Sequence, residues 1–332
     1  MNSFPLPAPP HQAPFLQLYT DFDGTLTTAD TLSALSQLAK TPPPPPPPPK
    51  PWAYFVDAYR EDLRLSLPPA PEPEPEPLSL GGSRTTLPQE AEYLEAFVPI
   101  ERRSIERLEQ AGFFAGLSAA RLRRCGFESA VSGAVGIRDG WWEVLAYLAD
   151  ERHKRKHAVA VISVNWSSEF IKGVLSGSYH LWCHHHHHHQ QGLAPPPTGS
   201  HPQGSSSSSL VDAISVYSND LLISPETRLT TGSFSRRRPP PPAGDGDRGV
   251  WAAADKLGVM TETLSSHGHH HAPAGAVITV YMGDSPSDLL CLLKADVGIV
   301  VGRDAALAAA CGRLGVPVED RKSTRLNSSH VD

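Results

Sequence analysis

The sequence predicts an α/β fold: a doubly wound, Rossmann-like, mainly parallel sheet with an inserted helical module and low-complexity loop inserts. Three features indicate this fold. Short apolar runs end in polar residues, helical patterns follow several of these runs, and blocks of proline, serine or histidine separate the regular segments. Since ligands bind at the carboxyl ends of parallel strands in such a sheet, the polar residues after the runs are the first candidates for a functional site.

The strands are predicted from near-continuous apolar runs, which are typical of parallel strands covered on both faces. The strongest runs are Phe15–Thr20, Ala158–Ser163 and Ala276–Gly283. Two further candidate strands are Ile214–Ser218 and Val297–Gly302, and helical patterns follow the second and third runs at Ser167–Leu175 and Pro286–Ala295. This alternation of strand and helix favours crossover connections between parallel strands.

A helical module is predicted between residues 31 and 135, where apolar residues recur every three or four positions. The segments with this pattern are Trp52–Leu65, Glu90–Phe114 and Leu117–Phe127. We therefore expect residues 31–135 to be inserted after the first strand, and residues 11–30 and 136–318 to form the discontinuous core.

Low-complexity blocks interrupt both parts. The chain has 34 prolines, many of them in blocks such as Pro42–Pro49 and Pro71–Pro77, which favour extended polyproline II. We expect residues 184–210, 236–248 and 264–275 to be low-complexity loops, because loop-closure entropy rises only slowly with length. Within them, His184–His189 is interpreted as compositional drift in a loop, although neighbouring imidazoles are ready ligands for Zn²⁺ or Ni²⁺.

The end of the sequence suggests a different origin. Asp320–His330 back-translates to a common short-read sequencing adapter. Our hypothesis is that residues 320–332 are a read-through artefact, and we assign them no fold or function.

The charge and cysteine content of the chain indicate which kinds of molecule it is expected to bind and in which compartment. The formal net charge is −6, and the only basic clusters, Arg152–Lys156 and Arg236–Arg238, are short, which disfavours nucleic acid and anionic membranes. The four cysteines form no CxxC pair, which fits a reducing compartment. We see neither a signal peptide nor a run of membrane-spanning length, so a cytoplasmic protein with a small-molecule partner is expected.

The stretch DFDGT carries the first candidate chemistry. Asp21 follows a buried strand, where a carboxylate on a rigid element can attack phosphorus. Asp23 points the same way in an extended chain and can act as a general acid. Gly24 and Thr25 allow a sharp turn and offer an amide and a hydroxyl to phosphate oxygens. The alternative is an ordinary acidic surface turn, for which "DG" is common.

The stretch GDSPSD supplies a third carboxylate at a strand end. Asp284 could join Asp21 around a hard cation, since carboxylates, carbonyls and water are the ligands that Mg²⁺ prefers. Asp288, one helical turn later, is better suited to support the ligands from behind. These residues also open a helix, so an N-cap role is open beside the metal role.

Together these motifs resemble the haloacid dehalogenase (HAD) superfamily, in particular a fungal-type member of its phosphoserine-phosphatase-like branch. The order is DxDGT, a strand ending in serine, a lysine and GDSxxD, with a helical cap between the first two motifs, and the similarity covers roughly residues 15–318. The resemblance implies that Asp21 is the nucleophile and a Mg²⁺ ligand. It implies that Asp23 is the acid and base and lends its carbonyl to the metal.

The same resemblance implies roles for three further residues. Ser163 would bind a phosphoryl oxygen, although a plain strand-end serine is the alternative, and Lys256 would neutralise the nucleophile and the phosphoryl group. Lys172 is the fallback for this lysine. Asn219 matches an asparagine of a hairpin near the active site and is a candidate substrate contact, with a turn role as the alternative.

Residues that choose the substrate are harder to identify. Where the family usually has small residues after the serine, this chain has Asn165 and Trp166, which could line a reshaped pocket; Trp166 could equally be a core aromatic. Further candidate contacts are Asp30, Trp52, Trp141 and Trp142.

The expected activity is Mg²⁺-dependent hydrolysis of a small phosphomonoester through a phospho-aspartate intermediate. Dehalogenases of the superfamily lack the second aspartate, so Asp23 favours phosphate esters. Two alternatives stay open: a phosphomutase of the same fold, or a low-activity scaffold whose proline tracts dock SH3-type or WW-type domains.

Overall fold

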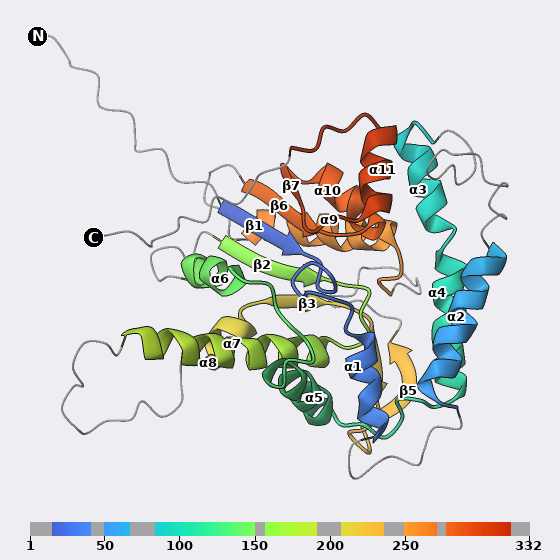
Figure 1. The fold of residues 1–332 in the computed structure, drawn as a ribbon, viewed down its shortest axis with the longest axis vertical. Helices are drawn as coiled ribbons and strands as arrows, with labels where there is room; N and C mark the ends of the chain where they lie inside the picture. The colour runs from blue at the N-terminus through green and yellow to red at the C-terminus, as the bar shows by residue number, and fades with distance from the viewer. Residues whose placement is uncertain are drawn as a thin grey trace, which may run out of the picture.

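The computed structural model describes residues 15–40, 50–66, 84–149, 157–190, 207–235, 249–270 and 277–319. These residues form a five-stranded parallel sheet and a separate antiparallel pair (Figure 1). The order in the sheet is β3 (Ser215–Tyr217), β2 (His157–Ile162), β1 (Phe15–Thr20), β6 (Val277–Gly283), β7 (Val297–Val300). The predicted Rossmann-like, mainly parallel α/β fold is therefore confirmed.

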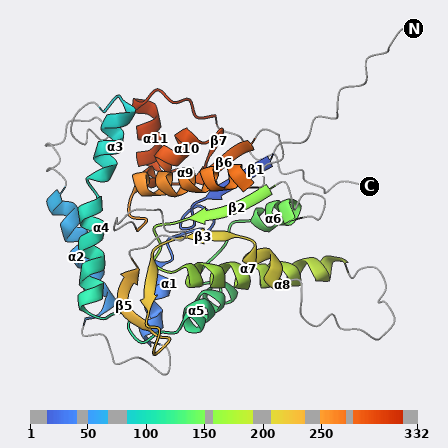
Figure 2. The ribbon, with the colours of Figure 1, turned by 180° about the vertical axis from the view of Figure 1, so that it is seen from behind.

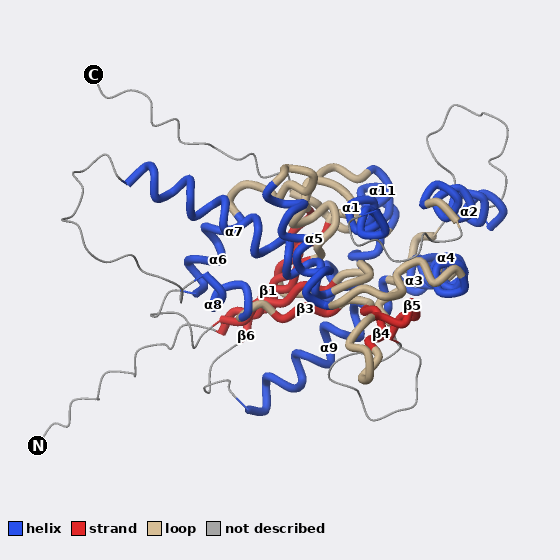
Figure 3. The backbone as a smooth tube through the Cα atoms, turned by 90° about the horizontal axis from the view of Figure 1, so that it is seen from below, coloured by secondary structure: helices blue, strands red, loops and turns tan. Residues whose placement is uncertain are grey.

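Helices cover both faces of the sheet (Figures 1 and 2). One layer consists of α9 (Ala253–His270), α10 (Leu289–Lys294) and α11 (Ala305–Arg313). The opposite layer consists of α5 (Ala119–Val131), α6 (Trp141–Ala149), α7 (Ser168–Gln190) and α8 (Ser207–Asp212). In Figure 3, α9 lies on one side of the strands and α5, α6 and α7 lie on the other.

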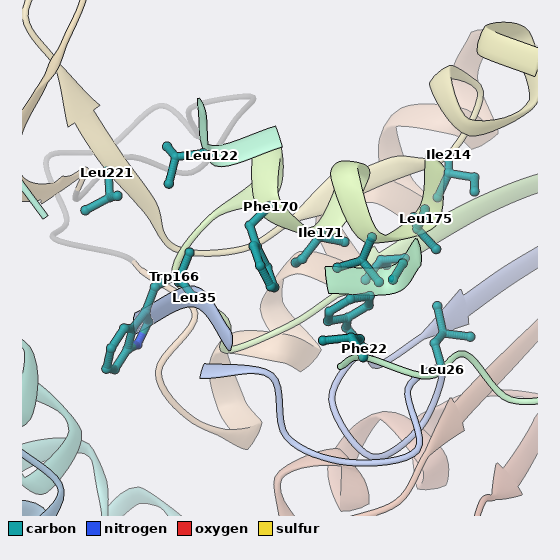
Figure 4. Packing of buried hydrophobic residues seen from close by; sticks show 14 of the residues in the cluster. Phe22, Leu26, Leu35, Leu122, Trp166, Phe170, Ile171, Leu175, Ile214 and Leu221 are labelled. Carbon is teal, nitrogen blue, oxygen red and sulfur yellow. The ribbon is translucent and has the colours of Figure 1, made fainter. Parts of the chain in front are cut away.

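Alternation along the strands explains why the core has two halves. Successive side chains of a strand point to opposite faces. Leu18 and Val161 accordingly belong to the hydrophobic cluster under α5 to α8, whereas Tyr19 and Ile162 belong to the cluster under α9 to α11. Figure 4 shows part of the first cluster. Each large apolar side chain buried in this way contributes roughly 1.5–3 kcal/mol.

The segment between β1 and β2 carries α1 (Leu32–Ser36), the short 3₁₀ helix η1 (Gln37–Lys40), α2 (Trp52–Ser66), α3 (Leu87–Glu95), α4 (Val98–Gln110) and then α5 and α6. Helices α2, α3 and α4 lie beyond the carboxyl ends of the strands (Figure 1). The pair β4 (Asp220–Ile223) and β5 (Thr230–Ser235) forms the predicted hairpin, near α4. The 3₁₀ turn η2 (Pro286–Asp288) precedes α10. The division into core and cap stays a prediction.

Several predicted element boundaries differ from the observed ones. The single helical segment Glu90–Phe114 is two helices, which break at Ala96 and Phe97. Pro99 lies in the first turn of α4, where its missing amide costs least. Helix α7 continues to Gln190, and α8 begins at Ser207, so both ends of the predicted loop 184–210 are helical instead. Helix α9 continues to His270, so the first part of the predicted loop 264–275 is helical as well. Extending a formed helix costs far less than nucleating one, and histidine is tolerated in helices.

Other predictions lie outside the described residues. These are the loop 236–248, the proline blocks at 42–49 and 71–77, and the suspected adapter segment 320–332. Among the residues that the structure does describe, no helix combines the length and the apolar character needed to cross a membrane.

Candidate active site

The parallel pairing of β1 with β6 brings the two acidic motifs together. Thr20 pairs with Met282, and the amide of Asp21 donates to the Met282 carbonyl at 2.9 Å. Asp21 and Asp284 follow these two strands directly, so they meet at the carboxyl edge of the sheet. Carboxylate oxygens of Asp21, Asp284 and Asp288 all lie within 4.8 Å of one another.

Lys256 reaches this group from the first turns of α9. Its ammonium Nζ lies 3.1 Å from Asp21 Oδ1 and 2.7 Å from Asp288 Oδ1, and its side chain is fully buried. Burial alone would lower the pKa of Lys256, but the two carboxylates outweigh it and raise this pKa. The fallback, Lys172, instead lies on α7, 3.8 Å from Glu169.

Asp21 is nearly inaccessible to solvent, with 4% exposure. Burial raises the pKa of its carboxyl, and the Lys256 ammonium works against that rise. Because the ammonium has a second carboxylate beside it in Asp288, we assign the proton of this pair to Lys256. Within the described residues, Asp21 Oδ1 has no hydrogen-bond donor other than this ion-pair partner.

Asp288 supports the other site residues through both of its carboxylate oxygens. Oδ1 accepts from Lys256 Nζ at 2.7 Å and from the Tyr281 hydroxyl at 2.8 Å. Oδ2 accepts from the amides of Asp284 and Ser285 at 3.1 and 3.2 Å. Asp288 therefore fixes both the lysine and the loop that carries Asp284, and the predicted N-terminal capping role is present as well.

Asp23 lies apart from the three-carboxylate group. Its Oδ1 accepts from the amide of Thr31 and its Oδ2 from Asn165 Nδ2, each at 2.8 Å. Burial raises its pKa to about 6, while the hydrogen bonds from Asn165 and Thr31 limit the rise. A carboxyl with a pKa near neutrality can both give and take a proton, as an acid–base group requires.

The turn after Asp23 packs against the Asp284 carboxylate and helps to position it. Gly24 has a φ of +74°, a conformation that favours glycine, and a Cβ there would collide with the Asp284 carboxylate. The Thr25 hydroxyl, predicted to contact phosphate, donates to Asp284 Oδ1 at 2.7 Å. Arg138 donates to the carbonyls of Gly24 and Thr25 at 2.7 and 3.0 Å. No sequence motif pointed to Arg138.

The residues after β2 and β3 complete the edge. Ser163 is fully buried, and its Oγ accepts from the amide of Asn165 at 3.1 Å. Asn219 donates to the carbonyls of Val164 and Val250 and accepts from the Val250 amide, at 3.1, 2.9 and 2.8 Å. Its amide group thus braces two backbone segments, which differs from the predicted substrate contact.

A cavity of about 680 Å³ lies beside these groups. Its walls come from α2, α3 and α4 on one side and from the loops after β2 and β6 on the other. Asp30, Trp52 and Trp166 line it. The other two candidate contacts do not: Trp141 and Trp142 are buried in the core on α6, where hydrophobic packing rather than the motif loops determines their position.

The donor set at the edge suits a hard divalent cation. Carboxylate oxygens are the ligands that Mg²⁺ prefers. Since both Asp288 oxygens already accept hydrogen bonds, Asp21 and Asp284 are the carboxylates that could hold a metal. Asp23, predicted to contribute only its carbonyl, keeps its carboxylate outside this group.

Comparison with known proteins gives distant relatives. No protein-family model matches the chain. A CTO1 family protein of Schizosaccharomyces pombe is 24% identical over 284 residues, which cover 85% of this chain and 80% of that protein. The Bifunctional TH2 protein, mitochondrial, of Arabidopsis thaliana is 30% identical over 110 residues, 33% of this chain but only 15% of that protein.

Comparison with solved structures finds a HAD-family hydrolase and a phosphoserine phosphatase. The HAD-family hydrolase, from Salmonella enterica serovar Typhi, has a TM-score of 0.42 at 13% identity and covers 86% of this chain and 63% of that chain. The phosphoserine phosphatase, with substrate bound, has a TM-score of 0.39 at 13% identity and covers 89% of this chain and 96% of that chain.

Proposed function

We propose that this protein is a Mg²⁺-dependent phosphatase of the HAD type, which hydrolyses a small phosphomonoester through a phospho-aspartate at Asp21. One observation carries the proposal. At the carboxyl edge of a parallel sheet, Asp21 is buried against the Lys256 ammonium at 3.1 Å, and a carboxylate oxygen of Asp284 lies within 4.8 Å. An isolated acidic surface turn would need neither the buried cation nor the distant third carboxylate.

The reaction has two steps. Asp21 attacks phosphorus and the ester bond breaks, while Asp23 gives its proton to the leaving oxygen. A water molecule then gives a proton to Asp23 and attacks the phospho-aspartate, which releases inorganic phosphate and restores Asp21. Asn165 and Thr31 keep the Asp23 carboxyl in place for both transfers.

Charge stabilisation falls to the groups around the nucleophile. Lys256 is already held in position by Asp288, so its charge needs no rearrangement when the phosphoryl group arrives. Bound by Asp21 and Asp284, Mg²⁺ would polarise the phosphoryl oxygens and screen the clustered negative charge. The buried Ser163 hydroxyl lies at the same sheet edge and is proposed to bind a phosphoryl oxygen. We propose further that α2, α3 and α4 act as a cap over the organic part of the substrate, and that the enzyme works in the cytoplasm.

The test is hydrolysis of p-nitrophenyl phosphate by the full chain, with Mg²⁺ or with EDTA. We expect turnover that EDTA abolishes and that added Mg²⁺ restores. Asp21→Asn should lower kcat by about a thousandfold or more, since it removes the nucleophile. Asp57→Asn, on the exposed face of α2, is the matched control and should behave as the wild type. Equal, metal-independent release of p-nitrophenol by the wild type and Asp21→Asn would contradict the proposal.

A further inference from the structure

The cavity has the dimensions of a site for an organic ligand. At about 680 Å³ it falls within the range of small-molecule sites, and it is lined mainly by apolar groups. It adjoins the catalytic groups without being lined by Asp21 itself. Val164 and Ser285 in its wall are the chain neighbours of Ser163 and Asp284. A phosphomonoester bound at Asp21 would therefore extend its organic part into this cavity.

Aromatic rings dominate the wall. Seven of the lining side chains are Trp, Tyr or Phe, contributed by both the helical segment and the loops. Trp52 of α2 meets Trp166 of the β2 loop edge to face, with ring centroids 5.9 Å apart. Such rings offer flat apolar surface, and their faces also attract positive charge.

Two carboxylates share this wall. Asp30 and Glu101 line the cavity, and within the described ranges neither forms an ion pair with a lysine, arginine or histidine. The Tyr59 hydroxyl donates to Glu101 Oε1 at 2.6 Å and so fixes the carboxylate at the wall. Partial burial raises the pKa of both carboxyls, while hydrogen bonds from the Leu32 amide to Asp30 and from the Tyr59 hydroxyl to Glu101 limit the rise.

The arginines of the cavity are already engaged with another acid. Arg84 and Arg313 both pair with the buried Glu90, at 3.0 and 2.8 Å. Arg84 also stacks on Tyr93, with its guanidinium carbon 3.7 Å from the ring centroid. These arginines and Glu90 come from α11, α3 and the residues just before α3. Asp30 and Glu101 lie elsewhere in the wall, and burial together with the charges of Glu101 and Asp30 raises the pKa of Tyr59, which links α2 to α4. The cavity therefore has a separate acidic side.

We propose that the cavity takes a phosphomonoester whose organic part carries a cationic group on or next to a flat ring. This inference rests on the proposed phosphatase function and deepens it by naming the substrate class. The ring would lie among the aromatic side chains, and the cation would supply the counter-charge that Asp30 and Glu101 lack among the described residues. A neutral ligand would leave both carboxylates unpaired, and an anionic ligand would be repelled.

The test compares two ligands of nearly the same shape. The probes are 4-(trimethylammonio)benzylphosphonate and 4-tert-butylbenzylphosphonate, which differ in charge and cannot be hydrolysed. Dissociation constants are measured by isothermal titration calorimetry on the full chain with Mg²⁺. We expect the cationic probe to bind about tenfold more tightly than the neutral one. Glu101→Gln and Asp30→Asn, which lie on different elements, should each reduce this ratio severalfold.

Glu106→Gln is the matched control, because Glu106 lies on the exposed side of the same helix as Glu101 and does not line the cavity. It should keep the wild-type ratio. Equal binding of the two probes by the wild type, or an unchanged ratio in both cavity variants, would overturn the proposal even if p-nitrophenyl phosphate is hydrolysed. Selective binding without any metal-dependent turnover would instead retain the cationic site and refute the phosphatase.

Discussion

The acidic side chains at the sheet edge have a cation beside them, whereas the acidic side chains in the cavity wall do not. At the edge, the Lys256 ammonium is enclosed by two carboxylates, Asp21 and Asp288, and all three side chains are almost wholly buried. In the cavity, Asp30 and Glu101 share a wall with aromatic side chains, and no cation from the described residues pairs with them. The carboxylates at the sheet edge therefore have their counter-charge before a ligand binds, whereas the carboxylates in the cavity do not.

This difference matches two roles: phosphoryl transfer, which is the same for every substrate, and recognition of the organic part, which differs between substrates. Phosphoryl transfer always develops negative charge at the same atoms, so a fixed cation can be held ready for it. The organic part of a substrate varies between enzymes, and a wall that lacks its counter-charge selects the ligand that supplies it. Changes at the edge should therefore harm stability and activity together, whereas changes in the cavity should alter selectivity and leave stability nearly intact.

Replacing the buried lysine should have the largest effect. Lys256→Met keeps the length of the side chain but leaves Asp21 and Asp288 without their cation. We expect a loss of about 3 kcal/mol or more in the free energy of unfolding, measured by urea denaturation at pH 7, and a kcat lower by about a thousandfold. Lys172→Met, at the surface of α7, is the control. Retention of activity by Lys256→Met would separate the lysine from the chemistry.

Removing the brace at Asn219 should have an intermediate effect. Asn219→Ala deletes three hydrogen bonds to Val164 and Val250. We expect a loss of about 1–3 kcal/mol in stability, with KM for p-nitrophenyl phosphate close to the wild-type value. Leu222→Ala, exposed in the same hairpin, is the control. A raised KM with an unchanged melting temperature would instead favour the substrate contact predicted from the sequence.

Neutralising Glu101 in the cavity should have the smallest effect on stability. The direction of the change in Tm shows whether the charge of Glu101 stabilises the fold. Burial raises the pKa of Glu101 above its value in the unfolded chain, so the folded state binds this proton more tightly. Ionisation therefore costs stability as pH rises through that window, and Gln does not ionise. Glu101→Gln should raise Tm by roughly 1–3 °C at pH 8 and by less at pH 4.5. A lower Tm than the wild type at pH 8 would show that the charge stabilises the fold.

Much of the sheet and its edge could be predicted from the sequence, because local pattern and topology agree there. An apolar run followed at once by an acid, as at Asp21 and Asp284, places the acid at a strand end, and parallel pairing brings strand ends together. The order of the motifs sufficed to choose Lys256 over Lys172. The role of Asp288 was only partly predictable, because its link to Tyr281 depends on side-chain packing.

The residues that line the cavity could not be predicted from the sequence, because tertiary packing brings them together. Asp30 lies in the loop before α1 and Glu101 on α4, and only the tertiary packing that forms the cavity brings both into one wall. Two neighbouring tryptophans on α6 looked like candidate contacts, yet an amphipathic pattern does not reveal which layer a helix joins. The His184–His189 run, taken for a loop, is helical because helix α7 is already formed before it.

Two independent features of the structure require glycine at position 24. Its backbone adopts a left-handed conformation, and the space where a side chain would begin is filled by the Asp284 carboxylate. A saturation library at this codon, selected for activity, should therefore return only glycine, which makes the position a sensitive reporter of whether the acid keeps its place.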